Sequence, residues 1–530
     1  MPTYNNPVIS GFHPDPSVCR VGEDYYLVCS SFEYFPGVPL FHSRDLVHWR
    51  QIGNVLDRPG QLDLRDDARA SGGIYAPTIR HHDGRFYMIT TNVSGRGNFI
   101  VTSERPEGPW SDPVWIDLPG IDPDLAWDDD GSCWCAFSGV RVARIDPRTG
   151  EVLDGPWPVW SGTGLQYPEA PHLYRVGDWW YLMIAEGGTE RGHGVSIARA
   201  RSPRGPYEPA PANPILSHRS TDRPIQNTGH ADLVSAPDGS WWMVLLATRP
   251  RGSSPGFHVL GRETFLTPVR WEDGWPQVGP VLEEHQAPAA WQPTEPAPYR
   301  DDFDTPVPAP GWISPRSRPD RSWSLSDRPG WLTLTATGPT LDRPGHTFIG
   351  HRQQHRDCRV SARLDPGTGR AGLSVRLDEA HHYDIEVSGG EAAVIARIGP
   401  LRQAVARHPV PPGPLTLVIE VRTTDQVPPS VVSAGHAAGE PLGVGADGPD
   451  TIAFSLLLPE PVLLAELDGR YLSTEVATGF TGRVIGMYVT DGSAAFDWFD
   501  HRPTTVPAPR SEHDAADPAP RSEHDAAAPR

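Results

Sequence analysis

Three acidic residues hold the same position in three similar segments of the chain. Asp15, Asp122 and Glu169 each begin a stretch of alternating apolar residues, which is followed by a glycine turn and an aromatic-rich strand. Carboxylates that converge raise one another's pKa, so a fold keeps them together only where a function, a cation or basic partners justify it. Two carboxyl groups flanking a sugar ring are the usual machinery of glycoside hydrolysis: one is a protonated general acid, the other is an ionised base or nucleophile, and a third can tune the acid. The three residues are therefore candidates for this chemistry if the fold brings them together.

The segments that carry these acids belong to a set of five with one layout. They begin, at spacings of 60, 47, 47 and 61 residues, at Asp15, Tyr75, Asp122, Glu169 and His230. Asp-Gly pairs at 83–84, 130–131 and 238–239 predict hairpin turns within three of them. Antiparallel units repeated at such a period are typical of a β-propeller, in which equivalent residues of the innermost strands converge on the axis. We therefore predict five blades and a shared site for the acids, in preference to five unrelated hairpins in a large sandwich.

The composition changes after the fifth segment. Residues 1–285 form the predicted propeller, and the Pro- and Ala-rich residues 286–300 form a predicted linker. Strand-like alternation without the blade layout fills 301–505, which predicts an antiparallel, lectin-like β-sandwich and hence an all-β chain. The last 25 residues, 506–530, contain PAPRSEHDAA twice and are predicted to be a disordered tail.

Composition excludes several classes of function. The 530 residues carry a net charge of −20, and all 46 basic residues are Arg, so nucleic acids and anionic membranes are poor partners and lysine Schiff-base chemistry is excluded. The five cysteines show no disulfide framework and are interpreted as reduced thiols. No membrane-spanning apolar run and no basic, apolar leader are visible, which predicts a cytoplasmic protein.

The motifs around these acids resemble glycoside hydrolase family 43. They are GFHPDPSVCRVGEDYYLV, SGGIYAPTIR, GIDPDLAWDDDG, YPEAPHLYRVGDWWYL, GHADLV and LGRETFL, and the resemblance runs from about Asn6 to Pro503. It is strongest to the branch of β-xylosidases and α-L-arabinofuranosidases with a C-terminal β-sandwich. The resemblance implies a five-bladed propeller and an inverting hydrolase. In it Asp15 matches the general base and Glu169 the general acid, while a negative Asp122 raises the pKa of Glu169 and positions it. Inversion leaves room for a water molecule, so the carboxyls of base and acid are expected roughly 6.5–9.5 Å apart.

The resemblance also implies substrate-binding residues. Arg262 matches the arginine that binds the sugar in the innermost subsite, and it also offsets the clustered negative charge. His230 matches an axial histidine that in some members binds Ca²⁺ or a water molecule; a hydrogen-bonded core histidine is the alternative. Phe32 and Tyr75 are expected to line the pocket or to be ordinary propeller packing.

Two further matches and one departure concern the rim of the site. Arg58 resembles a contact on the leaving-group side, with a surface arginine as the alternative. Phe480 resembles the sandwich aromatic that reaches over the site and makes the enzyme exo-acting, with sandwich core as the alternative. Asp124 stands where the family commonly has Ser; its carboxylate is expected either to disturb the pKa of the acid or to face solvent.

We therefore predict an exo-acting, inverting glycoside hydrolase that removes β-1,4-linked xylose from the non-reducing end of short xylo-oligosaccharides. An α-L-arabinofuranosidase or a bifunctional enzyme is the alternative, because the two sugars place their hydroxyls alike. A non-catalytic sugar-binding propeller is the alternative from another class, and a structural scaffold is more remote. No cofactor is expected to be required. Calcium at His230 and a homo-oligomeric state are left open.

Overall fold

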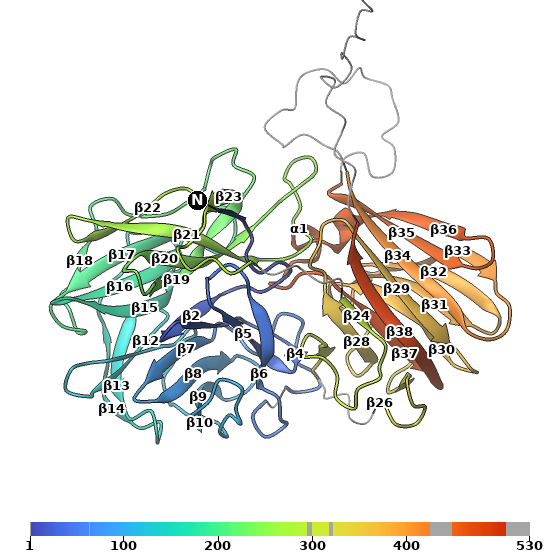
Figure 1. The fold of residues 1–530 in the computed structure, drawn as a ribbon, viewed down its shortest axis with the longest axis horizontal. Coiled ribbons are helices and arrows are strands. Elements are labelled where there is room, and N and C mark those ends of the chain that lie inside the picture. Colours follow the sequence, from blue (N-terminus) through green and yellow to red (C-terminus); the bar gives the residue numbers. More distant parts are fainter. Residues whose placement is uncertain (1, 63, 294–298, 317–321, 425–447, 505–530) are drawn as a thin grey trace, which may run out of the picture.

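The computed structural model describes residues 2–62, 64–293, 299–316, 322–424 and 448–504. These residues form two bodies of β-strands, with the N-terminal one on the left of Figure 1 and the C-terminal one on the right. The helical residues η3 (Gly469–Leu472) and α1 (Thr474–Ala477) lie in the C-terminal part. Within the described ranges no helix has the length and apolar character to cross a membrane.

The N-terminal body is a propeller of five four-stranded antiparallel sheets, as the repeats predict. The first two blades contain β2 (Ser17–Val21), β3 (Asp24–Val28), β5 (Gly37–Ser43) and β6 (Arg50–Leu56), then β7 (Thr78–His82), β8 (Arg85–Asn92), β9 (Gly97–Ser103) and β10 (Val114–Trp115). The third and fourth contain β11 (Asp124–Trp127), β12 (Cys133–Phe137), β13 (Arg141–Ile145) and β14 (Val152–Pro158), then β15 (Glu169–Val176), β16 (Trp179–Glu186), β17 (Gly194–Ala200) and β18 (Glu208–Pro209). The fifth contains β19 (Gln226–Ser235), β20 (Trp241–Thr248), β21 (Glu263–Glu272) and β22 (Trp275–Val278).

Turn chemistry explains why the second segment folds back on itself. His82 pairs with Arg85, so Asp83 and Gly84 form a two-residue loop, and both have a left-handed backbone with φ of 47° and 72°. Two positive φ values in a row are the type I′ turn that matches the twist of a hairpin, and the Asp-Gly pair adopts it at low cost. The hairpin predicted at 83–84 is therefore confirmed.

The ring is closed by the start of the chain. Strand β1 (Thr3–Asn5) pairs with β23 (Glu284–Gln286), which follows the fifth blade, and Ile9 bridges to Thr264 on β21. Residues at opposite ends of the propeller sequence therefore hydrogen bond to each other, which holds the first and fifth blades together.

The innermost strands are joined by a buried polar cluster around Arg80 on β7. The Arg80 guanidinium lies 2.9 Å from Asp124 Oδ1 on β11 and 2.8 Å from Asp232 Oδ2 on β19. Asp232 also accepts hydrogen bonds from the hydroxyls of Ser17 on β2 (2.8 Å) and Tyr174 on β15 (2.7 Å). All five blades thus contribute to one network. Both expectations for Asp124 are wrong, because its carboxylate is fully buried and neutralised by Arg80 rather than facing the acid or the solvent.

Replacement of Arg80 with methionine is expected to lower the free energy of unfolding by about 3–5 kcal/mol, because it leaves two buried carboxylates without their cation. Urea unfolding followed by tryptophan fluorescence measures this change. The control Arg85→Met removes an exposed ion pair with Glu104 (3.0 Å) and should leave the unfolding curve almost unchanged. Equal effects of the two substitutions would contradict the structural role of the cluster.

The C-terminal body is the predicted β-sandwich. One sheet contains β26 (Trp323–Ser324), β27 (Leu332–Thr335), β38 (Ser493–Pro503), β29 (Cys358–Asp365), β34 (Leu415–Thr423), β35 (Asp450–Leu457) and β36 (Val462–Asp468), with β24 (Tyr299–Asp301) paired to β38. The other contains β28 (Thr347–Arg352), β37 (Val484–Asp491), β30 (Arg370–Arg376), β31 (His381–Ser388), β32 (Glu391–Ile398) and β33 (Leu401–Pro409). The alternation read from the sequence is visible in β29, where Cys358, Val360, Ala362 and Leu364 all enter the core.

The two bodies share a direct interface. Strand β25 (Ser314–Pro315) pairs with β4 (Tyr34–Phe35) of the propeller, and Arg376 on β30 donates to the Tyr34 hydroxyl at 3.1 Å. The predicted linker, 286–300, overlaps the end of β23 and the start of β24, and its residues 294–298, like the predicted tail 506–530, lie outside the described residues. The domain boundaries stay predictions. All five cysteines are buried and free, as interpreted from the sequence.

Candidate active site

The three acids stand at the start of inner strands of three blades. Asp15 and Asp122 lie two residues before β2 and β11, and Glu169 is the first residue of β15. Asp15 and Asp122 have left-handed backbones with φ of 56° and 55°, as does His230 at the fifth segment with 46°. Such conformations cost about 1–3 kcal/mol for residues other than glycine and collect at functional sites. The repeated strained position is a structural reason to regard this end of the propeller as the site.

Asp15 is a buried carboxylate held by three polar neighbours. It accepts a hydrogen bond from Ser30 Oγ at 2.5 Å, and its Oδ1 lies 3.1 Å from Arg262 Nη1 and 3.3 Å from His230 Nδ1. Burial by itself would raise the pKa of this carboxyl, but the neighbouring groups outweigh burial and hold the pKa below its ordinary value. Asp15 is therefore ionised at neutral pH and can accept a proton.

The pKa values of Glu169 and Asp122 are raised, whereas that of Asp15 is lowered. Burial and the negative charge of Asp15 raise the pKa of Glu169 to about 7. Burial and the neighbouring Glu169 raise the pKa of Asp122 well above its ordinary value. Since ionisation of one disfavours ionisation of the other, the pair retains a proton near neutral pH. The expectation of a negative Asp122 changes accordingly: Asp122 is buried, and the retained proton belongs to the pair.

Arg262 links the acids to neighbouring aromatic residues. It is buried just before β21, and its Nη1 donates to Asp15 and, at 3.0 Å, to the hydroxyl of Thr189. Its guanidinium carbon lies 5.2 Å from the centre of the Phe480 ring and 5.8 Å from that of Phe32. Thr189 was missed from the sequence because it lies in the loop beyond β16, outside the repeated layout.

An aromatic wall joins propeller and sandwich. The ring of Phe480 lies 6.1 Å from that of Phe32 and 6.0 Å from that of Tyr75, and Phe32 and Tyr75 are 5.8 Å apart. Phe480 comes from the loop after α1, yet it packs against the propeller aromatics rather than within the main sandwich core. The structure therefore places all three predicted aromatics together beside Arg262.

Two residues that the sequence did not indicate hold Phe480 in place. The backbone N–H of Phe480 donates to Ser71 Oγ at 2.8 Å, and the backbone N–H of Ser71 donates to Glu33 Oε2 at 2.8 Å. Glu33 is fully buried, and burial raises its pKa to about 7. This chain of contacts fixes the sandwich loop against the propeller.

Arg58 and His230 occupy different surroundings. Arg58 donates to the carbonyl of Trp110 (2.9 Å) and to Asp112 (3.1 Å), and among the described residues it has no recorded contact with the acids. His230 is buried beside Asp15, and burial lowers its pKa to about 3, so it is neutral.

The residues around His230 do not fit a protein-bound cation. Across the described ranges, no three His, Cys, Asp or Glu side chains form a group that could hold a metal ion.

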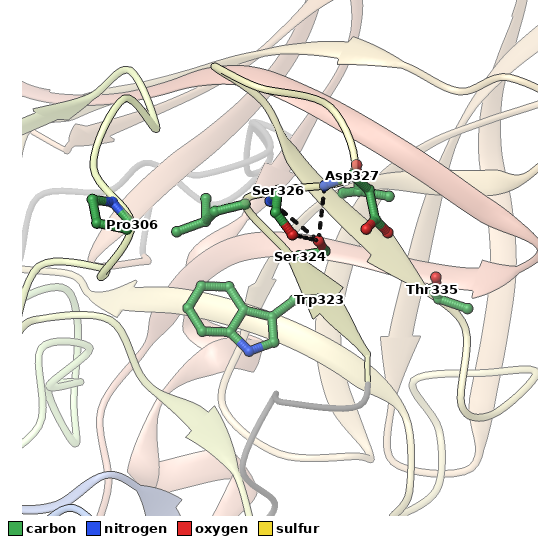
Figure 2. A pocket seen from close by; sticks show the side chains of 8 residues that line it. Pro306, Trp323, Ser324, Ser326, Asp327 and Thr335 are labelled. Carbon is green, nitrogen blue, oxygen red and sulfur yellow. Dashed lines mark hydrogen bonds between the residues drawn. The ribbon is translucent and has the colours of Figure 1, made fainter.

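A hollow of about 560 Å³ lies elsewhere, over β26 and β27 of the sandwich. Figure 2 shows Trp323 and Asp327 beside it, with Ser324 Oγ accepting the Asp327 N–H at 3.0 Å. None of the three acids lines this hollow.

Comparison with known proteins finds relatives that cover both bodies of the chain. A model of glycosyl hydrolases family 43 matches residues 4–276, and a model of the beta xylosidase C-terminal concanavalin A-like domain matches 300–439 and 459–502. A Bacteroides ovatus protein named non-reducing end alpha-L-arabinofuranosidase is 40% identical over 537 residues, covering 94% of this chain and 95% of its own. A Butyrivibrio fibrisolvens protein named xylosidase/arabinosidase is 36% identical over 540 residues, covering 95% and 99%. A solved structure described as Bacteroides ovatus Xyloglucan PUL GH43B superposes with a TM-score of 0.86 at 38% identity and covers 95% of this chain and 100% of its own.

Proposed function

The chain belongs to glycosyl hydrolase family 43. We propose that it is an exo-acting, inverting hydrolase that removes xylose from the non-reducing end of short β-1,4-xylo-oligosaccharides. The observation that carries the mechanism is the opposed charge state of two carboxyls in one site. Neighbouring groups lower the pKa of Asp15, whereas burial and the charge of Asp15 raise that of Glu169 to about 7. One carboxyl is thus ready to accept a proton and the other to donate one.

The reaction follows from these two states. Asp15 removes a proton from water as the water oxygen attacks the anomeric carbon, and Glu169 donates its proton to the leaving glycosidic oxygen. Asp15 ends protonated and Glu169 ionised, so proton exchange with solvent restores the site. Asp122 acts by sharing a proton with Glu169, and Arg262 keeps Asp15 ionised.

The aromatic wall supports exo action. Phe480 reaches from the sandwich to Phe32 and Tyr75, so the pocket has a side built from the second domain. A pocket bounded on that side suits a chain end better than the middle of a polymer. Short oligosaccharides are therefore the proposed substrates.

An α-L-arabinofuranosidase is the second candidate, because the Bacteroides ovatus relative carries that name over nearly the whole chain. Hydrolysis of 4-nitrophenyl β-D-xylopyranoside and 4-nitrophenyl α-L-arabinofuranoside side by side distinguishes the two. We expect the xyloside to have the higher kcat/KM. A higher value for the arabinofuranoside would support the second candidate, and no hydrolysis of either would support a sugar-binding propeller.

The pH profile of kcat/KM for xylobiose should be a bell with its alkaline limb near pH 7. Glu169 must be protonated to act, so activity falls as pH rises through its pKa of about 7. Asp15 must be ionised, and because its pKa is lowered, the acid limb should lie below about pH 4. With a 4-nitrophenyl glycoside, whose leaving group needs little protonation, the alkaline limb should flatten. An alkaline limb that does not depend on the leaving group would contradict the assignment of Glu169.

Replacement of Phe480 with alanine should raise KM for xylobiose about tenfold, the effect of losing about 1.4 kcal/mol of binding, with a smaller change in kcat. The reason is that Phe480 packs against Phe32 and Tyr75, whereas the proposed proton transfers belong to Asp15 and Glu169. Steady-state kinetics on xylobiose measure KM and kcat separately. Tyr471→Ala removes an exposed aromatic of the same domain, on η3, and should leave KM unchanged. An unchanged KM in Phe480→Ala would remove this residue from the pocket.

A further inference from the structure

A small cavity between the two domains is unusually rich in arginine. It measures about 20 Å³ and is lined by Arg249 and Arg251 from the propeller loop before β21 and by Arg356 and Thr423 from the sandwich. This cavity is separate from the acids and has no part in the proposed reaction. Three guanidinium groups around so small a space repel one another unless negative charge compensates them.

The carboxylates beside the cavity are already engaged. Glu263 is bound by Arg249 through two contacts of 2.7 Å, which neutralises that arginine. Asp450 is bound by Arg483 on the sandwich side through contacts of 2.6 and 2.9 Å. Among the described residues, neither carboxylate has a recorded ion pair with Arg251 or Arg356, and Glu263, with Glu283, only partly offsets the positive charges that act on Arg356.

Arg251 and Arg356 are half-buried arginines that line this cavity. Among the residues that the structure describes, neither guanidinium has a recorded ion pair, and the Nε of Arg356 is buried without a hydrogen-bond partner. Burial and the positive charges of Arg249 and Arg251 lower the pKa of Arg356 to about 9. A partly buried cation without an ion pair costs free energy, and an anion placed beside it would recover part of that cost.

We propose that this cavity binds one small inorganic anion of the size of chloride or bromide between Arg251 and Arg356, and that the bound anion holds the two domains together. The volume sets the size class, since a site for a single water molecule needs about 10–15 Å³, and a sugar or a nucleotide does not fit. The ligand is expected to be negatively charged, because Glu263 and Asp450 pair directly with Arg249 and Arg483, whereas Arg251 and Arg356 have no recorded ion pair within the described ranges. An anion here would contact both domains at once.

Thermal unfolding of the full chain tests the proposal, with sodium chloride exchanged for sodium gluconate at constant ionic strength. Gluconate is too large for the cavity. The wild-type midpoint is expected to rise by several degrees and to saturate with chloride, because a ligand that binds only the folded state stabilises it. Arg356→Met should abolish the response and should be at least as stable as the wild type in gluconate. Arg359→Met, which removes a half-exposed arginine paired with Glu420 on neighbouring strands, should keep the wild-type response.

Crystals soaked in sodium bromide give a second readout that needs no variant. An anomalous peak between the guanidinium groups of Arg251 and Arg356 is expected. A wild-type midpoint that does not depend on chloride, or an equal response in Arg356→Met, overturns the proposal, as does a soaked crystal without the peak. These measurements use no substrate, so their outcome is independent of the proposed glycosidase activity.

Discussion

Replacement of Glu169 with glutamine is expected to lower kcat for xylobiose about 10³-fold, within the range that a general acid contributes. Glutamine has nearly the same shape but no proton to give to the glycosidic oxygen, and the sugar leaving group of xylobiose needs that proton. The neutral amide should also keep the fold, because Glu169 is itself protonated near neutral pH, its pKa being raised by burial and by Asp15 to about 7. Initial rates on xylobiose measure the effect.

The leaving group separates loss of the acid from general damage. With 4-nitrophenyl β-D-xylopyranoside, Glu169→Gln should lose far less activity, because nitrophenolate departs without protonation. Glu190→Gln is the matched control: its carboxylate is exposed and also raises the pKa of Glu169, but it has no proposed role in proton transfer. A variant that still hydrolyses xylobiose at the wild-type rate would show that another group is the acid.

Replacement of Asp15 with asparagine should lower kcat by about 10³–10⁴-fold on every substrate. The amide cannot remove a proton from water, and a better leaving group does not replace a missing base. Xylobiose and 4-nitrophenyl β-D-xylopyranoside should therefore lose activity to a similar extent, in contrast to Glu169→Gln. Initial rates on both substrates measure this pattern.

The fold of Asp15→Asn must be checked, because the substitution removes the anion that Arg262 contacts at 3.1 Å. Circular dichroism and the thermal midpoint serve for this. Asp112→Asn, at an exposed carboxylate that pairs with Arg58, is the control and should keep full activity. If the loss of activity in Asp15→Asn depended on the leaving group, Asp15 would be the general acid and Glu169 the general base.

Much of the fold could be predicted because it depends on local patterns. The turn at Asp83 and Gly84 is a two-residue signal, and the alternation in β29 is read directly from four apolar positions. The acids could be grouped because a propeller repeats one position around an axis, so Asp15 and Glu169 occupy equivalent places in their blades. Because the repeats are arranged around one axis, a local sequence pattern also predicts which distant residues lie close together.

The contacts that could not be predicted join residues from different repeats or domains. Arg80 and Asp232 are 152 residues apart, and Ser71 and Phe480 are 409 apart, with no shared motif that links them. Asp124 illustrates the limit: its position relative to Asp122 was readable, but its partner on another blade was not. Pairings of this kind follow from packing between elements, and a single sequence carries no periodic signal for them.

The central claim is that Asp15 activates water while Glu169 protonates the leaving group, and the configuration of the first sugar released tests it most directly. A proton NMR time course of hydrolysis, recorded before mutarotation, identifies that anomer. Inversion predicts that α-xylose appears first from a β-xyloside, or the β-anomer first from an α-L-arabinofuranoside. The anomer of unchanged configuration appearing first would mean a covalent intermediate and would contradict the account.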